Sequence, residues 1–330
     1  MSCHIVAVTP AGRRAYLEIL KTYILRDETI ERWDLWDNCR AEADRTYIRE
    51  LAKTHKKIRI VDAPSVDGSN GSINQFYRRA SDCSTFYIKM DDDVLYLPEQ
   101  FGAAFYRAAS AERGKYTWWS PLVINNAICS WLLKYHSHIG ISANLSASAS
   151  CVHGWRSWRF AEALHRMFIE MLKQGNLLVF HVPNFDISLS RFSINCIGFF
   201  GEDVATLGDT FCPLGEDDEE WISAVLPSMT GKPGRIIGHL VVSHFSFFTQ
   251  EEDLLRTGLL DDYAGLAGVS VLPLPAPRVR SFRARLRWLL EKRLFGGSRA
   301  YTITPPENRS REPTPTHSFS IAGGGSQCLS

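Results

Sequence analysis

The chain of 330 residues is 45% hydrophobic and 22% charged, which is typical of a globular enzyme with a large buried core. Its formal net charge of +1 gives no global attraction to nucleic acid, so we expect no nucleic-acid partner. An uninterrupted apolar run of about 18 residues is missing, which excludes a membrane-spanning helix.

Short apolar strands alternate with amphipathic helices along the N-terminal third of the chain. The predicted strands cover residues 4–8, 31–36, 58–61 and 85–90, and the predicted helices cover 13–25, 44–55 and 73–80. Alternation of this kind predicts an α/β fold with a mostly parallel central sheet and helices on both faces. Ligands of such sheets bind beyond the carboxyl ends of the strands.

Polar and turn-forming residues follow several of these predicted strands. They are Thr9-Pro10-Ala11, Asp37-Asn38 and Asp91-Asp92-Asp93. Because parallel strands end at the same edge of a sheet, we expect these three segments to converge there.

The pattern becomes less regular after residue 98. Helices are predicted over 99–113, 160–174 and 250–267, with another beginning over 219–226, and strands over 116–124, 192–200 and 236–247. Residues 139–158 are rich in Ser, Ala, His and Gly, which predicts a long functional loop. Residues 296–330 are rich in Pro, Ser, Thr and Gly, which predicts a disordered tail.

The cysteines give a prediction of redox state. The chain has 8 Cys but no C-x-x-C pair, so their spacing does not indicate a zinc ribbon or a thioredoxin-like motif. No signal peptide precedes the first predicted strand at His4. We therefore expect reduced thiols and a cytoplasmic protein.

The acidic run Asp91-Asp92-Asp93 directly follows an apolar strand and precedes Val94-Leu95. Adjacent carboxylates repel one another, and a divalent cation offsets that cost. Carboxylate oxygens suit Mg²⁺ or Mn²⁺. A solvated turn is the alternative interpretation, but the apolar segments on both sides favour a cation site.

With its acidic run placed directly after an apolar strand, the sequence resembles the GT-A glycosyltransferases. Their nucleotide-binding half ends in a strand that carries a D-x-D motif, as the segment from Ile88 to Asp93 does here. The segment from Val6 to Ala11 is similar to the family's donor-binding first strand and turn. Asn74 and Arg78 precede the D-x-D strand, at the place where the family commonly contacts the nucleoside.

Two later segments resemble the family's acidic motifs. The segment from Pro213 to Trp221 is similar to the glycine-plus-acid segment that supplies the catalytic base in inverting members. Gly201-Glu202-Asp203-Val204 resembles the acidic motif of the β-1,3-galactosyltransferase-like branch. The resemblance therefore offers Asp217, with its neighbour Asp218, and Asp203 as candidate bases. We favour Asp217, because it lies at a predicted helix start with acids around it.

The segment Val242-Ser243-His244-Phe245 resembles a late histidine that some members use as a metal ligand. The resemblance thus implies a Mn²⁺ or Mg²⁺ site made by Asp91, Asp93 and His244. Further residues are implied to contact the donor or the waters of the metal: Thr9, Pro10, Ala11, Asp37, Asn38, Asn74, Arg78, Asp91 and Asp92.

The implied activity is metal-dependent transfer of a sugar from a nucleotide-diphosphate sugar to a glycan, lipid-linked or other hydroxyl acceptor. The assignment of a carboxylate base favours inversion of the anomeric centre, and a retaining reaction is the alternative. A UDP-sugar is the favoured donor. The resemblance divides the chain into a nucleotide-sugar-binding half, residues 1–98, and an acceptor and catalytic half, residues 99–275.

Residues 276–295 form a predicted basic amphipathic helix, in which apolar side chains alternate at helical spacing with arginines and lysines. Such a helix either contacts an anionic membrane as a peripheral anchor or packs its apolar stripe against the catalytic domain. The sequence leaves both interpretations open.

Two other classes of function compete with sugar transfer. A sugar-phosphate nucleotidyltransferase would need a Gly-rich, Arg-containing loop after the first strand, and Thr9-Pro10-Ala11-Gly12-Arg13 has a single Gly. A non-enzymatic calcium- or carbohydrate-binding module is the second alternative. The acidic run lacks the alternating acids and the Gly of an EF-hand loop.

Overall fold

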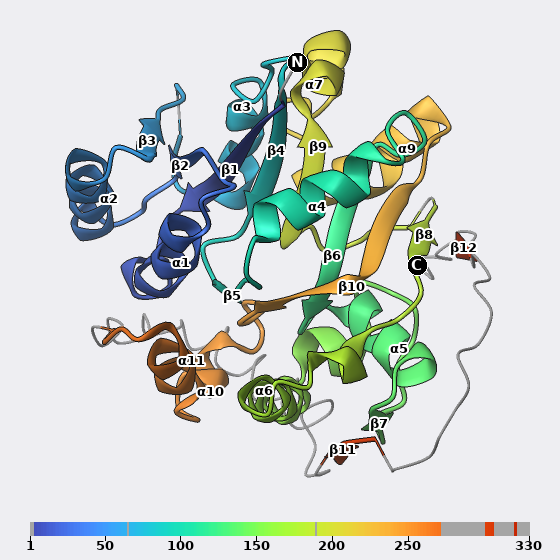
Figure 1. The fold of residues 1–330 in the computed structure, drawn as a ribbon. Helices are drawn as coiled ribbons and strands as arrows, with labels where there is room; N and C mark the ends of the chain where they lie inside the picture. The colour runs from blue at the N-terminus through green and yellow to red at the C-terminus, as the bar shows by residue number, and fades with distance from the viewer. Residues whose placement is uncertain (1–2, 65, 189, 272–300, 307–319, 322–330) are drawn as a thin grey trace, which may run out of the picture.

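The computed structural model describes residues 3–64, 66–188, 190–271, 301–306 and 320–321. Within these residues a large sheet runs through the molecule and helices pack against it (Figure 1). The strands are β1 His4–Ala11, β2 Arg32–Asp37, β3 Ile58–Val61, β4 Thr85–Met90, β5 Val94–Tyr96, β6 Trp118–Ile124, β7 Gly140–Ile141, β8 Phe185–Ile187, β9 Cys196–Phe200, β10 Gly234–His244, β11 Ile303–Thr304 and β12 Ser320–Ile321.

The helices connect these strands and flank the sheet. They are α1 Arg14–Arg26, α2 Glu42–Thr54, α3 Asn74–Tyr77, α4 Phe101–Ser110, α5 Ala127–His136, α6 Trp158–Lys173, α7 Gly201–Leu207, α8 Asp218–Glu220, α9 Leu226–Thr230, α10 Glu251–Leu254 and α11 Leu259–Ala267. Among the described residues, every helix is too short or too polar to cross a lipid bilayer.

The main sheet has the strand order β12-β8-β10-β6-β9-β4-β1-β2-β3, with β5 paired to β10. Strands β3, β2, β1 and β4 are mutually parallel, and β6 is parallel to β10. Strand β9 is antiparallel to both β4 and β6, so it joins two parallel blocks that point the same way. The predicted mostly parallel α/β sheet is confirmed. The carboxyl ends of β1, β2, β4, β6 and β10 consequently share one edge.

Helices cover both faces of the sheet, as its alternating side chains show. Phe86 of β4 packs edge-on against Phe105 of α4, with ring centroids 5.5 Å apart. The next residue, Tyr87, points to the opposite face and stacks on Phe199, which contacts Tyr77 of α3. Because successive strand residues face opposite ways, α4 and α3 lie on opposite faces. Burial on both faces explains why all six residues of β4 are buried.

A register shift bends β10 toward the acidic run. Its pairing with β6 jumps between Ile237 and Val241, and Gly238 lies at this irregularity. A Cβ on Gly238 would lie 2.0 Å from the carbonyl oxygen of Val182, so a side chain there would clash. Beyond the irregularity the strand also pairs with β5, where His244 lies opposite Val94. The bend therefore positions His244 beside the turn between β4 and β5.

Several predicted elements differ from the structure. The helix expected over 73–80 ends at Tyr77, and the strand expected over 192–200 begins at Cys196. The helix expected over 250–267 is split into α10 and α11 by Gly258, whose φ is +79°. Helix α5 and strands β5 and β8 were not predicted from the sequence. The expected loop over 139–158 contains β7 and a π-helical turn at Val152–Arg156.

Two short parts of the predicted disordered tail form strands. Strand β11 pairs with β7, and β12 pairs with β8. Tyr301 packs its ring against Phe160 of α6 and accepts or donates a 2.8 Å hydrogen bond at Nδ1 of His153. The prediction of disorder is therefore wrong for these segments. The predicted amphipathic helix at 276–295 lies outside the described residues.

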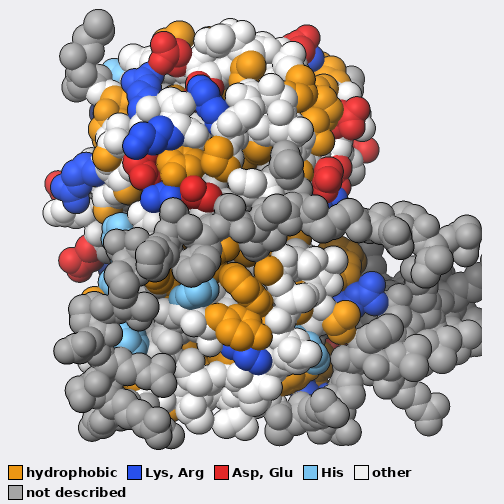
Figure 2. Space-filling model, turned by 90° about the vertical axis from the view of Figure 1, so that its right-hand side faces the viewer, with side chains coloured by type: hydrophobic (Ala, Val, Ile, Leu, Met, Phe, Trp, Pro, Cys, Tyr) orange, Lys and Arg blue, Asp and Glu red, His pale blue; other side chains and the backbone are white. Residues whose placement is uncertain are grey.

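The surface reflects the near-neutral net charge of the chain. On the face shown in Figure 2, acidic and basic side chains are interspersed over the upper part, and hydrophobic and histidine side chains gather in the lower part.

Candidate active site

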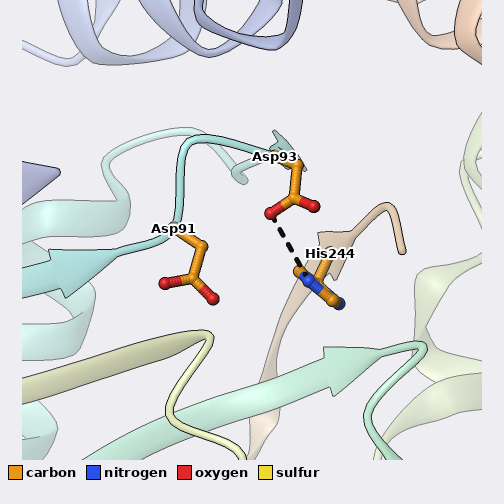
Figure 3. Close-up of side chains that lie close together, drawn as sticks. All are labelled: Asp91, Asp93 and His244. Carbon is orange, nitrogen blue, oxygen red and sulfur yellow. Dashed lines mark ion pairs between the residues drawn. The ribbon is translucent and has the colours of Figure 1, made fainter. Parts of the chain in front are cut away.

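Asp91, Asp93 and His244 converge at the carboxyl edge of the sheet (Figure 3). One potential ligand atom from each lies within 4.8 Å of the others. Nε2 of His244 is 3.4 Å from Oδ1 of Asp93. Carboxylate oxygens and an imidazole nitrogen are ligands that Mn²⁺ accepts, and the carboxylates also suit Mg²⁺. The structure therefore brings together the three residues that the sequence predicted as a metal site.

Backbone hydrogen bonds hold this cluster in place. The amide of Asp91 donates to the carbonyl of Asn195 at 2.8 Å, and the amide of Phe245 donates to the carbonyl of Asp93, also at 2.8 Å. These bonds tie the turn between β4 and β5 to the start of β9 and the end of β10. The cluster is thus built by the turn between β4 and β5 and by the end of β10, and the residue before β9 supports it.

One oxygen of Asp93 is buried without a hydrogen-bond partner. Asp93 is 1% exposed, and its Oδ2 atom accepts no hydrogen bond from the described residues. Arg13 Nη2 approaches Oδ2 to 3.1 Å as an ion pair but without hydrogen-bond geometry. A buried, unsatisfied carboxylate oxygen is costly, and a bound cation would relieve that cost. The donor set therefore fits a divalent cation.

Asp92 has a different environment from its two neighbours. Its Oδ1 accepts a 3.0 Å hydrogen bond from Nε of Arg13, and its Oδ2 accepts one of 3.1 Å from the amide of Gly12. Burial raises the pKa of Asp92 to about 6, although the Arg13 guanidinium opposes that rise. Arg13 also binds Glu251 at 2.8 Å. Asp92 therefore links the loop after β1 to the acidic run.

Lys89 is a buried cation beside the cluster. It is 3% exposed, and its Nζ donates to Oδ1 of Asp91 at 2.5 Å and to the carbonyl of Ile194 at 2.9 Å. Burial alone would lower its pKa, but the carboxylates of Asp91 and Asp218 outweigh burial and raise it. Lys89 is therefore charged, and it interacts with both Asp91 of the cluster and the carboxylate of Asp218. A lysine inside an apolar strand was a visible signal, which sequence reasoning did not use.

Asp218 faces Lys89, whereas Asp217 faces solvent. The hydroxyl of Tyr77 donates to Oδ2 of Asp218 at 3.2 Å, and this half-buried carboxyl has its pKa raised by burial, with Lys89 opposing the rise. Asp217 is exposed, caps α8 by accepting from the amide of Glu220 at 2.9 Å, and pairs with Arg191 at 3.0 Å. Of these two predicted bases, Asp218 is the one whose charge interacts with that of Lys89, the partner of Asp91.

Asp203, the third predicted base, lies at the opposite edge of the sheet. It belongs to α7, which follows the carboxyl end of the antiparallel strand β9. Burial raises its pKa, and Lys232 and Arg113 are the cations nearby. Because β9 runs against β4, residues after β9 emerge at the edge where β4 begins. The structure therefore separates Asp203 from the acidic run, which corrects its candidacy as the base.

The last residues of β1, Thr9 to Ala11, are buried in the molecule. Thr9 accepts a 3.0 Å hydrogen bond from the indole of Trp33. The carbonyl of Ala11 accepts from the thiol of Cys39, and Pro10 lies opposite Trp36 in the β1–β2 pairing. These residues reach the same edge as the acidic run, but their recorded contacts are with protein groups.

Asp37 is the last residue of β2 at that edge, and Asn38 follows it. Asp37 pairs with Nε of Arg45 at 3.1 Å. Asn38 donates to the carbonyl of Ser69 at 3.3 Å and accepts from the hydroxyl of Ser72 at 2.9 Å. Asn38 thus ties the segment from Ser69 to Ser72 to the end of β2.

Asn74 and Arg78 differ in their surroundings. Asn74 is buried, and its amide donates to the carbonyls of Pro213 and Glu216, each at 2.7 Å. Arg78 is exposed and pairs with Asp209 at 2.9 Å. Asn74 therefore anchors the acid turn, by which we mean residues 213–218.

The described cysteines are free thiols: Cys3, Cys39, Cys83, Cys129, Cys151, Cys196 and Cys212. None belongs to the cation cluster.

Comparison with known proteins gives no match to a family model and no match to a curated protein sequence. Solved structures with a similar fold include GT-A glycosyltransferases and nucleotidyltransferases. A mannosyltransferase from Pyrobaculum calidifontis in complex with GDP-Man and Mn²⁺ has 14% identity and a TM-score of 0.47, over 88% of this chain and 70% of that one.

Two further structures show the same range of similarity. A glucosyl-3-phosphoglycerate synthase from Mycobacterium tuberculosis, in complex with Mn²⁺, UDP and phosphoglyceric acid, has 10% identity and a TM-score of 0.39, over 81% of this chain and 80% of that one. A 4-diphosphocytidyl-2C-methyl-D-erythritol synthase from Anaerococcus prevotii has 12% identity and a TM-score of 0.42, over 80% and 96%. At these values the likeness concerns the arrangement of the chain and carries no information on the reaction.

Proposed function

We propose that this protein is a metal-dependent glycosyltransferase that moves a sugar from a nucleotide-diphosphate donor to a hydroxyl acceptor. The observation that carries the proposal is the partly buried cluster of Asp91, Asp93 and His244, whose neighbour Lys89 pairs with Asp91 and interacts with the charge of Asp218 in the acid turn. It combines a site for a divalent cation with a carboxylate placed to accept a proton. A UDP-sugar is the favoured donor, and a glycan or lipid-linked hydroxyl compound is the acceptor.

Asp91, Asp93 and His244 would hold the cation. The chemistry that a Mn²⁺ or Mg²⁺ ion supplies when bound is stabilisation of the negative charge on the departing diphosphate. The protein's own contribution is to fix the two carboxylates and the imidazole before the donor arrives. Lys89 adds a fixed positive charge beside Asp91.

Asp218 is the proposed base for the acceptor hydroxyl. Its carboxylate takes the hydroxyl proton while the acceptor oxygen forms a bond to the anomeric carbon. The bond from that carbon to the diphosphate oxygen breaks, and its electron pair leaves with the diphosphate. Attack on the face opposite the leaving group inverts the anomeric centre. Burial raises the pKa of Asp218, which makes it a stronger base than an exposed aspartate.

Nucleotidyl transfer is the second candidate, but the loop after β1 disfavours it. Arg13 is its cation, and the guanidinium is engaged with Asp92, Asp93 and Glu251. A triphosphate would have to compete with three carboxylates for it. A calcium module is also disfavoured, since Ca²⁺ prefers six to eight oxygen ligands and the cluster offers two carboxylates and an imidazole.

A donor panel tests the proposal. The protein is incubated with UDP- and GDP-sugars, with Mn²⁺, Mg²⁺ or chelator, and release of nucleoside diphosphate is measured with and without glycan acceptors. Metal-dependent release supports sugar transfer. Release of pyrophosphate from a nucleoside triphosphate and a sugar phosphate would establish nucleotidyl transfer instead, and glycan binding without turnover of any donor would establish a binding module.

A further inference from the structure

We propose that Asn195 is a positioning residue of the cation site, and that Asn126 fixes its orientation. Together they hold His244 in the tautomer whose Nε2 is free to bind a cation, and they direct one oxygen of Asp91. The relevance to catalysis rests on the proposed function. The hydrogen bonds themselves do not, and they can be tested without metal or donor.

The orientation of Asn126 is set by helix α5. As the N-cap residue, its side-chain Oδ1 accepts from the backbone amides of Ile128 at 3.1 Å and Cys129 at 3.2 Å. Backbone amides are donors only, so the oxygen of Asn126 must face them. Its Nδ2 therefore points away from the helix and donates to the carbonyl of Ser193 at 2.9 Å and to Oδ1 of Asn195 at 3.1 Å.

The orientation of Asn195 follows from that of Asn126. Its Oδ1 faces the amide hydrogens of Asn126, so its own Nδ2 faces the cluster. There it lies 3.2 Å from Oδ2 of Asp91 and 3.3 Å from Nε2 of His244. The amide has two hydrogens, and each has one acceptor. If the side-chain amide of Asn195 were turned by 180°, its NH₂ group would face the NH₂ group of Asn126. Its oxygen would then face the carboxylate of Asp91.

Two independent contacts assign the tautomer of His244. Its Nδ1 is 3.4 Å from the backbone carbonyl of Asn125, which is an acceptor only, so Nδ1 carries the hydrogen. Its Nε2 faces an amide donor of Asn195, so Nε2 carries the lone pair. Oδ1 of Asp93 lies 3.4 Å from the same nitrogen, so a cation bound at Nε2 would also be within reach of that carboxylate. A carbonyl at the second ring nitrogen is the usual way in which a metal-binding histidine is oriented.

The carbonyl of Asn125 is itself held firmly. Asn125 has a left-handed φ of +63°, and its side-chain amide donates to the carbonyl of Phe245 at 2.8 Å and to Oε1 of Gln250 at 3.0 Å. Asparagine tolerates this conformation better than most residues. The pair Asn125-Asn126 at the end of β6 thus supports the imidazole from one side and the Asn195 amide from the other.

This arrangement explains how the cluster is kept ready for a cation. The Asn195 hydrogen that faces Nε2 of His244 is hydrogen-bonded to the lone pair that a cation would bind. A cation would therefore replace this hydrogen bond. The hydrogen that faces Asp91 can remain and keep that carboxylate directed. Without the side-chain amide of Asn195, the carboxylate of Asp91 and the imidazole of His244 would each lose a neutral hydrogen-bond donor. That donor lies between the two groups.

The first test measures the tautomer directly. The metal-free protein, labelled with ¹⁵N-histidine, is studied by NMR at pH 8, and the His244 signals are assigned with His244→Gln. We expect hydrogen on Nδ1 and a bare Nε2 in the wild-type protein. Hydrogen on Nε2 in the wild-type protein would overturn the proposal without any variant being needed.

Two isosteric variants test the role of each asparagine. Asn195→Asp replaces the donor that faces Nε2 by an acceptor, so the population with hydrogen on Nε2 should become the larger one. Asn126→Asp keeps the helix cap but removes the donor to Asn195, whose amide then turns, so the same change is expected although Asn126 does not touch His244. Asn184→Asp is the matched control, because its Oδ1 accepts from the amide of Gly238 at 3.0 Å, away from the cluster.

An unchanged tautomer of His244 in both Asn195→Asp and Asn126→Asp would overturn the proposal. The same change of tautomer in Asn184→Asp would also overturn it. Mn²⁺ affinity, read from the electron paramagnetic resonance of free Mn²⁺, should fall about 10- to 100-fold in Asn195→Ala. Undiminished affinity contradicts the positioning role. Since none of these measurements uses a donor, failure of sugar transfer in the donor panel leaves them valid.

Discussion

The three aspartates of the acidic run have different partners, although the sequence presents them as equivalent. Asp91 is bound by Lys89 and by Asn195, Asp92 by Arg13 and the amide of Gly12, and Asp93 lies against His244. Each partner comes from another part of the chain. The division of roles within the run follows from these contacts.

Asp93→Asn and Asp92→Asn should therefore affect different properties, the first the affinity for metal and the second the stability of the fold. Asp93→Asn keeps the shape of the side chain but removes the charge at the buried cluster, so Mn²⁺ affinity should fall by more than about tenfold while stability changes little. Asp92→Asn weakens the contact with Arg13 and should cost about 1 to 3 kcal/mol of stability.

Calorimetric titration with Mn²⁺ and urea unfolding of both variants check this pair. Loss of metal affinity confined to Asp92→Asn would contradict the assignment.

The base can be identified by comparing three amide variants. Asp218→Asn should slow the chemical step by ~10²-fold or more, with little change in donor affinity, because its carboxylate takes the proton of the acceptor. Asp217→Asn should be milder, since that side chain caps α8 and pairs with Arg191 at the surface. Asp203→Asn is the remote control. Single-turnover kinetics with a saturating donor measure the step, and a slow Asp217→Asn beside a normal Asp218→Asn would reverse the assignment.

At the scale of elements, strand β9 decides which acidic segments meet. It runs antiparallel between β4 and β6, so Asn195 at its amino end lies at the sheet edge that carries the acidic run. Asp203, which follows its carboxyl end, lies at the opposite edge of the sheet. A period-two pattern in the sequence is the same for both directions, and for this reason the sequence left Asp203 as a competitor.

The acid turn depends on one side chain of α3. Asn74 donates to two carbonyls, those of Pro213 and Glu216. Asn74→Ala would leave both without that donor, and we expect a loss of about 1 to 3 kcal/mol in stability. Hydrogen exchange over residues 213–218 should accelerate more than exchange in β1.

Asn176→Ala, at an exposed position with no side-chain cap hydrogen bond, is the matched control and should leave both quantities unchanged. Equal exchange in the acid turn of the wild-type protein and Asn74→Ala would show that other contacts hold it.

At the scale of the molecule, the fold could be predicted further than the site. Apolar strands in regular alternation with helices are a local pattern, so the parallel sheet and the edge position of the acidic run follow from the sequence. Asn195 meets Asp91 across 104 positions, and the irregularity in β10 that brings His244 to Asp93 has no periodic signature. Such contacts depend on pairing between distant strands. The histidine was predicted from resemblance alone.

At the scale of the whole protein, one buried histidine should contribute a loss of stability in mild acid. His165 of α6 lies where this helix, α11 and β10 meet. Its Nε2 donates to the carbonyl of Phe245 at 2.9 Å, and its Nδ1 accepts from the hydroxyl of Tyr263 at 2.7 Å. Burial lowers the pKa of His165 from 6.5 to about 4, with the nearby carbonyl of Phe245 opposing that change. The folded state therefore needs a neutral ring in a pH range where the unfolded chain is protonated.

The sign and size of the effect follow from proton binding. Between pH 6.5 and 4 the unfolded state binds more protons at this position than the folded state, so the free energy of unfolding decreases as pH falls. Raised carboxyl pKa values, such as that of Asp218, act in the opposite direction, so the comparison must be with His165→Gln, which keeps a donor and an acceptor but cannot titrate. Urea unfolding at pH 7 and pH 4.5 should show the advantage of the wild-type protein over His165→Gln shrinking by about 2 to 3 kcal/mol. An advantage that is constant across this range would mean that His165 is protonated in the folded protein or accessible to water.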